Sequence, residues 1–109
     1  MSDRTALFAA VERLAGRLRA LPQRRLQAGA AAEGLELARW LAWQAQLLEF
    51  PGREPHRLPD DGIFVVGDQL AVAGHELAAA VGRERDPERV EGVLREAGER
   101  SAAAARAIG

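Results

Sequence analysis

Few side chains in this sequence have the type and spacing that chemistry requires, and the most suggestive are carboxylates. Glu33 and Glu36 are three residues apart and therefore share one face of a helix, while Asp68 belongs to a later predicted helix. Carboxylates on facing helices of a small bundle can hold Mg²⁺ against the phosphates of a nucleotide. These three residues are the candidate metal site of an alternative function, the hydrolysis of a nucleotide.

The Glu-x-x-Glu spacing of Glu33 and Glu36, with Asp68 on the next helix, resembles the motifs of the MazG-like all-α nucleotide pyrophosphatases. The resemblance is confined to the second and third predicted helices and implies a Mg²⁺-dependent pyrophosphohydrolase. In that family the later motif reads Glu-x-x-Asp, whereas Val65 stands three residues before Asp68 here. A metal site built on this pattern would lack one ligand, so we prefer a non-enzymatic function.

The two histidines have no obvious partners for metal binding or acid–base catalysis. His75 lies seven residues after Asp68, about 10 Å along a helix, and His56 lies in a proline-rich loop. The sequence has no Glu-x-x-His motif of the kind that di-iron bundles use, and it has no cysteine. We therefore expect no catalytic residue, no metal and no cofactor.

Arginines near the start of the chain are a candidate anion-binding or nucleic-acid-binding patch. They are Arg13, Arg17, Arg19, Arg24 and Arg25. The net charge of −1 gives no overall attraction to nucleic acid or to an anionic membrane, and no aromatic residues are interleaved with these arginines to stack on bases. We expect solvated, partly paired surface charges and neither nucleic acid nor a membrane as partner.

Hydrophobic spacing predicts four helices, over residues 3–20, 23–50, 62–81 and 87–107. In the first, large apolar residues recur at spacings of three and four, which is typical of a buried seam. They are Leu7, Val11, Leu14, Leu18 and Leu21. Proline at position 22 ends this pattern, since the residue before a proline is pushed out of helical geometry. Asp86-Pro87-Glu88 is a typical helix start, and Ser2 is the expected N-cap of the first helix.

Two stretches leave the local structure open. The second helix contains Gly29, which is costly in a helix interior and predicts a kink or fraying there. Residues 63–66, Ile-Phe-Val-Val, have strand-like side chains, but no other segment could pair with a strand. We therefore predict a helix at 63–66 as well.

Together these elements predict an all-α, single-domain protein over residues 1–109, an antiparallel four-helix bundle with up-down-up-down topology. Small residues repeat on the third helix (Gly67, Ala71, Gly74, Ala78) and on the second (Ala38, Ala42, Ala45). We expect these two stripes to face each other in a closely packed antiparallel pair, joined by the loop of residues 51–62.

The second helix is apolar on two sides. One side carries leucines and alanines, and the other, called here the aromatic face, carries Trp40, Trp43, Leu47 and Phe50. One small bundle does not clearly need both sides for its core, and aromatic residues are enriched at the centres of protein interfaces. The preferred function is therefore a protein-interaction or regulatory bundle that forms a homodimer through the aromatic face, with burial of this face inside a single bundle as the alternative.

The predicted location is the cytoplasm. The absence of cysteine is common there, and no apolar run reaches the roughly 18 residues of a membrane-spanning helix. The N-terminal residues become amphipathic too early for a secretory signal peptide.

Overall fold

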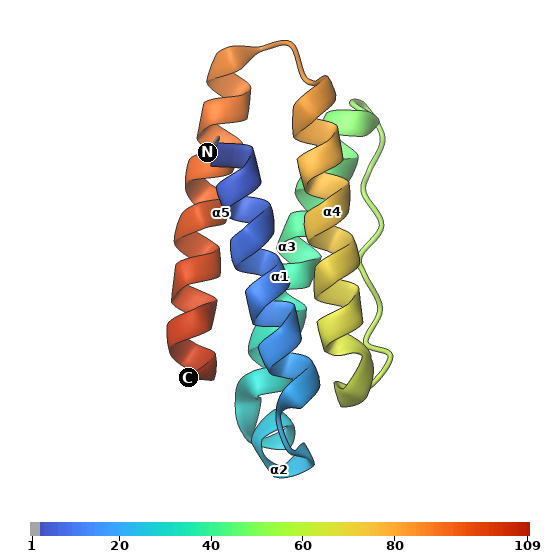
Figure 1. Cartoon of the computed structure of the whole chain (residues 1–109). Helices are drawn as coiled ribbons and strands as arrows, with labels where there is room; N and C mark the ends of the chain where they lie inside the picture. The colour runs from blue at the N-terminus through green and yellow to red at the C-terminus, as the bar shows by residue number, and fades with distance from the viewer. Residues whose placement is uncertain (1–2) are drawn as a thin grey trace.

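A computed structural model describes residues 3–109, and all regular structure in that range is helical (Figure 1). The four long helices expected from the sequence are present, and they pack against one another as a four-helix bundle. The elements in chain order are α1 (Asp3–Ala20), α2 (Gln23–Arg25), the π-helical turn η1 (Leu26–Ala30), α3 (Ala31–Glu49), the 3₁₀ turn η2 (Ile63–Val65), α4 (Val66–Arg83) and α5 (Pro87–Ile108).

The first helix buries the seam that the sequence predicts. Leu7, Val11, Leu14 and Leu18 are at most 5% exposed, and Leu21 packs against the core from the end of the helix. The expected N-cap, Ser2, lies outside the described residues. At the start of the last long helix Asp86 caps α5 as expected, because its carboxylate accepts hydrogen bonds from the backbone N–H groups of Glu88 and Arg89.

The second predicted helix is interrupted where its glycine stands, as expected. Gly29 has φ 141° and ψ −19°, values outside the helical range, and the backbone widens into a π-helical turn around it. Only glycine adopts such a positive φ without strain. The kink divides the predicted helix of residues 23–50 into the short α2 with η1 and the long α3.

Residues 63–66 are helical, which settles the strand-or-helix question in favour of the helix. A 3₁₀ turn covers Ile63–Val65 and leads directly into α4. Gly62, with φ 103°, makes the sharp change of direction before it. The third helix ends two residues later than predicted, at Arg83.

The direction of the third long helix is a correction to the predicted up-down-up-down order. α3 and α4 run in the same direction, opposite to α1 and α5 (Figure 1). A Cβ atom on Gly34, near the start of α3, would touch Val66 at the start of α4, while Glu49 and Arg83 at the two C-terminal ends form an ion pair. The second and third predicted helices are therefore parallel neighbours rather than an antiparallel hairpin.

The connection between α3 and α4 explains this direction. Residues 51–62 return along the length of the bundle in an extended conformation, over the seam between α3 and α4 (Figure 1). Twelve residues in a polyproline-like conformation span about 37 Å, which exceeds the roughly 28 Å of a 19-residue helix. The loop is therefore long enough to start the next helix at the opposite end of the bundle.

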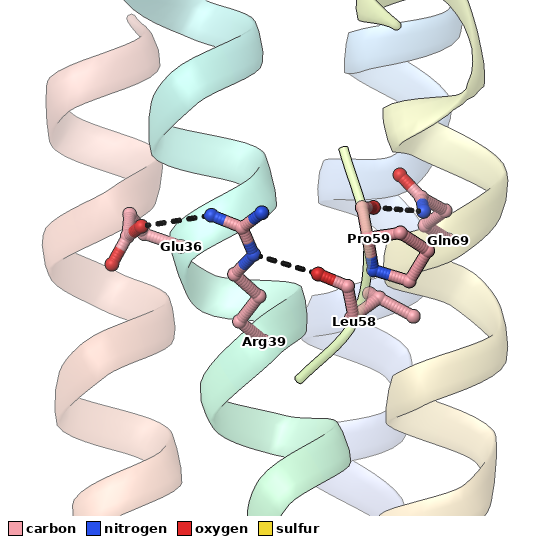
Figure 2. Close-up of polar contacts among 5 residues, drawn as sticks. All are labelled: Glu36, Arg39, Leu58, Pro59 and Gln69. Carbon is pink, nitrogen blue, oxygen red and sulfur yellow. Dashed lines mark hydrogen bonds and ion pairs between the residues drawn. The ribbon is translucent and has the colours of Figure 1, made fainter. Parts of the chain in front are cut away.

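Side chains of both helices hold this crossover loop in place. Gln46 makes two hydrogen bonds to the backbone of His56, and Arg39 Nε donates to the Leu58 carbonyl at 2.8 Å. From α4, Gln69 Nε2 donates to the Pro59 carbonyl at 3.0 Å (Figure 2). These hydrogen bonds hold the loop in place over the seam between α3 and α4.

The glycines of α4 face α1, not α3, which corrects the predicted pairing of the two small-residue stripes. Gly67 lies against Ala15 and Arg19, and Gly74 lies against Val11. These glycines therefore bring α1 and α4, which are antiparallel, close together, while α4 also packs extensively against α3. The alanines of α3 (Ala38, Ala42 and Ala45) are buried in the core, as are most of its leucines.

Candidate functional site

A groove of about 750 Å³ between α3 and α5 contains the two tryptophans. Leu37, Trp40 and Trp43 line it from α3, and the small side chains of Ala103, Ala104 and Ala107 line it from α5. Because alanines face the indole rings across the groove, the tryptophans remain only half-buried. This arrangement leaves an apolar, aromatic surface open to solvent along two antiparallel helices.

Charged side chains surround the groove. Arg100 lies over the Trp40 ring, with its guanidinium carbon 4.8 Å from the ring centroid, and also bonds to Glu96 at 3.0 Å. Arg39 pairs with Glu36 at 3.6 Å on the α3 side (Figure 2). Arg57 from the crossover loop also lines the groove. The result is an apolar floor with a rim of mixed charge, which resembles the anatomy of a small protein interface.

The four residues of the aromatic face do not share one environment. Trp40 and Trp43 lie in the groove, and Trp40 packs partly against the core. Leu47 is half-buried, whereas Phe50 at the helix end is 52% exposed, with the Arg53 guanidinium 5.6 Å from its ring centroid. Sequence spacing grouped these residues correctly on one side of α3, but α5 and the loop cover that side unevenly.

The carboxylates of the candidate metal site are not brought together. Glu33 and Glu36 line the α3–α5 groove. Asp68 points toward α1 instead, where its carboxylate accepts a 2.7 Å bond from Arg19. Within the part of the chain that the structure describes, no group of three acidic, histidine or cysteine side chains is placed to hold a metal ion. The geometry therefore gives no support to the predicted Mg²⁺ site.

The other polar residues considered as candidate sites make contacts that hold parts of the bundle together. His75 makes an edge-to-face contact with Phe8 of α1 at 5.6 Å between ring centroids, and the backbone of His56 is fixed by Gln46. Among the early arginines, Arg19 pairs with Asp68, and Arg25 donates to the Ile108 carbonyl at 2.9 Å. Arg19 and Arg25 therefore make separate structural contacts within the bundle.

A second apolar surface lies on the outer side of α4, and sequence reasoning missed it. Among residues 3–109 the exposed large apolar side chains are Phe50, Phe64, Val65 and Val72, and three of these four belong to η2 and α4. Phe64 is 67% exposed and Val72 is 56% exposed. The sequence does contain a sign of this surface, because Phe64, Val65 and Val72 are apolar residues that do not belong to the core face of the helix.

By length and composition, Ile63–Arg83 is also long and apolar enough to cross a membrane, a test that core helices of soluble proteins pass as well.

Comparisons with known protein families, with curated protein sequences and with solved structures found no match to this chain. The two surfaces described above are therefore interpreted from their own geometry.

Proposed function

We propose that this protein is a non-enzymatic, cytoplasmic protein-interaction module and that it associates with itself as a homodimer. The observation that carries the proposal is the set of large apolar side chains that the folded chain leaves uncovered, of which Phe50, Phe64 and Val72 are more than half exposed. Contiguous exposed apolar surface is typical of a protein–protein contact. Burial of that surface by a second copy would remove it from water.

Two surfaces are available for this contact. The sequence favours the aromatic face of α3, with Trp40, Trp43, Leu47 and Phe50, and the groove supports it by leaving both tryptophans partly open. The outer side of α4 offers the more exposed side chains. Self-association itself does not depend on which surface is used.

The mass in solution tests the proposal. Light scattering after size-exclusion chromatography is expected to give twice the chain mass of 11.7 kDa at micromolar concentration. A mass of one chain at every concentration tested would refute self-association. Trp43→Glu tests the aromatic face separately, because a charge placed in the groove would return the protein to a monomer if this face forms the contact.

A further inference from the structure

The outer side of α4 presents two parallel rows of side chains. One row lies beside α1 and consists of Phe64, Asp68, His75 and Ala79; the other lies toward α3 and consists of Val65, Val72, Glu76 and Arg83. Contacts across the bundle place each row. Asp68 forms an ion pair with Arg19 of α1 and the His75 ring contacts the Phe8 ring of α1, while Arg83 pairs with Glu49 of α3. The two rows together form what we call the α4 outer face.

This face carries both a protruding aromatic ring and a hollow of suitable size. The ring is Phe64, at 67% exposure. The hollow has a volume of about 300 Å³ and lies at the other end of the same row, lined by Arg4, Thr5, Phe8, His75, Ala78 and Ala79. Fifteen residues separate Phe64 from Ala79, about 22 Å along a helix, so the ring cannot reach the hollow of its own chain.

We propose that the α4 outer face binds the α4 outer face of a second copy, antiparallel, with Phe64 of each chain in the hollow of the other. The inference rests on the proposed self-association and names its surface. In an antiparallel two-fold arrangement the same row of each helix meets its counterpart, and each contact occurs twice. If the two-fold axis passes beside Val72, Phe64 of one chain lies opposite Ala79 of the other. The reason is that Phe64 is eight positions before Val72 and Ala79 is seven positions after it.

The charged residues of the face agree with this register. Asp68, four positions before Val72, comes opposite His75, three positions after it, so that a carboxylate meets an imidazole on the row beside α1. On the other row Arg83, the last residue of α4, comes opposite the end of the loop that precedes η2, where Asp60 and Asp61 lie. The Asp68–His75 pairs therefore lie on either side of Val72, between the centre of the contact and the outer contacts of Phe64 with the hollow. Glu76 and Asp68 belong to different rows, which keeps these two acids apart.

A cysteine cross-link tests the register directly, since the native chain has no cysteine. Val72→Cys is expected to form a disulfide-linked dimer on mild oxidation, because residues beside a two-fold axis can meet the short distance that a disulfide requires. Phe50→Cys is the matched control, with similar exposure at the end of the aromatic face. Cross-linking through position 50 but not through position 72 would overturn the inference.

Dissociation constants supply the second measurement. Phe64→Ser is expected to raise the dimer dissociation constant at least about tenfold, while Trp43→Glu leaves it unchanged. Phe64 is exposed in the single chain, so helix content by circular dichroism should stay at the wild-type value in that variant. A wild-type protein that is monomeric throughout refutes both the proposed function and the inference. A dimer that Trp43→Glu dissociates and Phe64→Ser does not affect overturns the α4 contact alone.

A lipid surface is the other apolar partner that this face could meet. Co-sedimentation with vesicles of mixed zwitterionic and anionic phospholipid separates the two partners. We expect the protein to remain in the supernatant. Binding of a monomer to the vesicles that is lost in Phe64→Ser would assign the face to lipid and overturn the inference.

Discussion

At positions 67 and 74 the absence of a side chain sets the distance between two helices. A Cβ atom on Gly74 would lie 2.6 Å from Cγ1 of Val11, and one on Gly67 would lie 3.0 Å from the backbone oxygen of Ala15. Neither neighbour can move away easily, because valine has one preferred rotamer in a helix and the carbonyl belongs to α1 itself. These two glycines allow α1 and α4 to pack closely, and this position of α4 leaves its outer face turned toward solvent.

Gly74→Ala should therefore destabilise the protein although alanine is the better helix former. We expect a loss of about 1–3 kcal/mol in the free energy of unfolding, because overpacking outweighs the gain in helix propensity of about 1 kcal/mol. Urea denaturation followed by circular dichroism measures the difference.

Gly98→Ala is the matched control for this substitution. Gly98 is also inside a helix, and a Cβ atom there would meet nothing within 4 Å. This change should stabilise the protein by up to about 1 kcal/mol. Equal effects of the two substitutions would show that the contact with Val11 does not limit the approach of the helices.

At the scale of the elements, two irregular segments decide how the long helices are placed. The turn at Gly29 redirects the chain between α2 and α3, and the crossover loop of residues 51–62 places the start of α4 beside the start of α3. Hydrogen bonds from Arg39, Gln46 and Gln69 fix the loop to both helices. The loop in turn brings Arg57 to the groove that contains the tryptophans.

Gly29→Ala should cost about 1–2 kcal/mol of stability, although open space surrounds the position. The reason is the backbone, since φ at 141° is a conformation that side chains disfavour. Thermal and urea unfolding measure the loss. Gly92→Ala, at a helical glycine of α5 that also has open space around it, should show none.

Gln46→Leu should loosen the crossover loop without unfolding the bundle. The Gln46 side chain holds His56 through two hydrogen bonds of 2.9 and 2.8 Å. Hydrogen exchange of the His56 amide is expected to accelerate by at least about tenfold, since one hydrogen bond contributes roughly 1 kcal/mol and two are lost together. Unchanged exchange of the His56 amide would mean that the remaining contacts of the loop are sufficient to hold it. Gln44→Leu, on the same helix, provides the control.

For the molecule as a whole, the loop length and the helix directions are coupled. Parallel α3 and α4 require a connection that travels the full length of a helix, whereas an antiparallel pair needs only a short turn. The α4 outer face and the α3–α5 groove lie on different sides of the bundle. The two candidate dimer contacts can therefore be tested independently.

Deletion of residues 54–57 tests the parallel arrangement. The shortened loop would have eight residues and an extended length of about 25 Å in a polyproline conformation, less than the roughly 28 Å of α3. We expect the bundle to lose cooperative thermal unfolding, as measured by circular dichroism. Insertion of four glycine or serine residues after Gly52 should be tolerated, with a loss of less than about 1 kcal/mol. Normal folding of the deletion variant would contradict the parallel pair.

The positions of the helices follow from the sequence alone. The apolar seam from Leu7 to Leu18, the cap at Asp86 and the break at Gly29 are local patterns, since each depends on residues within a few turns of one another. The same is true of the buried side of α3 and of the choice of helix at residues 63–66. The four-helix bundle followed from these patterns because four amphipathic helices of this length have few other ways to bury their apolar sides.

Which helices are neighbours, and in which direction they run, depends on the packing of the whole chain. Gly67 and Gly74 were recognised as contact residues, yet spacing along one helix cannot say whether α1 or α3 fills the opposite side. For the same reason the sequence groups Glu33, Glu36 and Asp68 into one candidate site, whereas in the folded chain Asp68 turns toward Arg19. Exposure is also a property of the packed molecule. Trp40 is partly covered by α5, while Phe64 and Val72 remain open because no helix within residues 3–109 covers the outer side of α4.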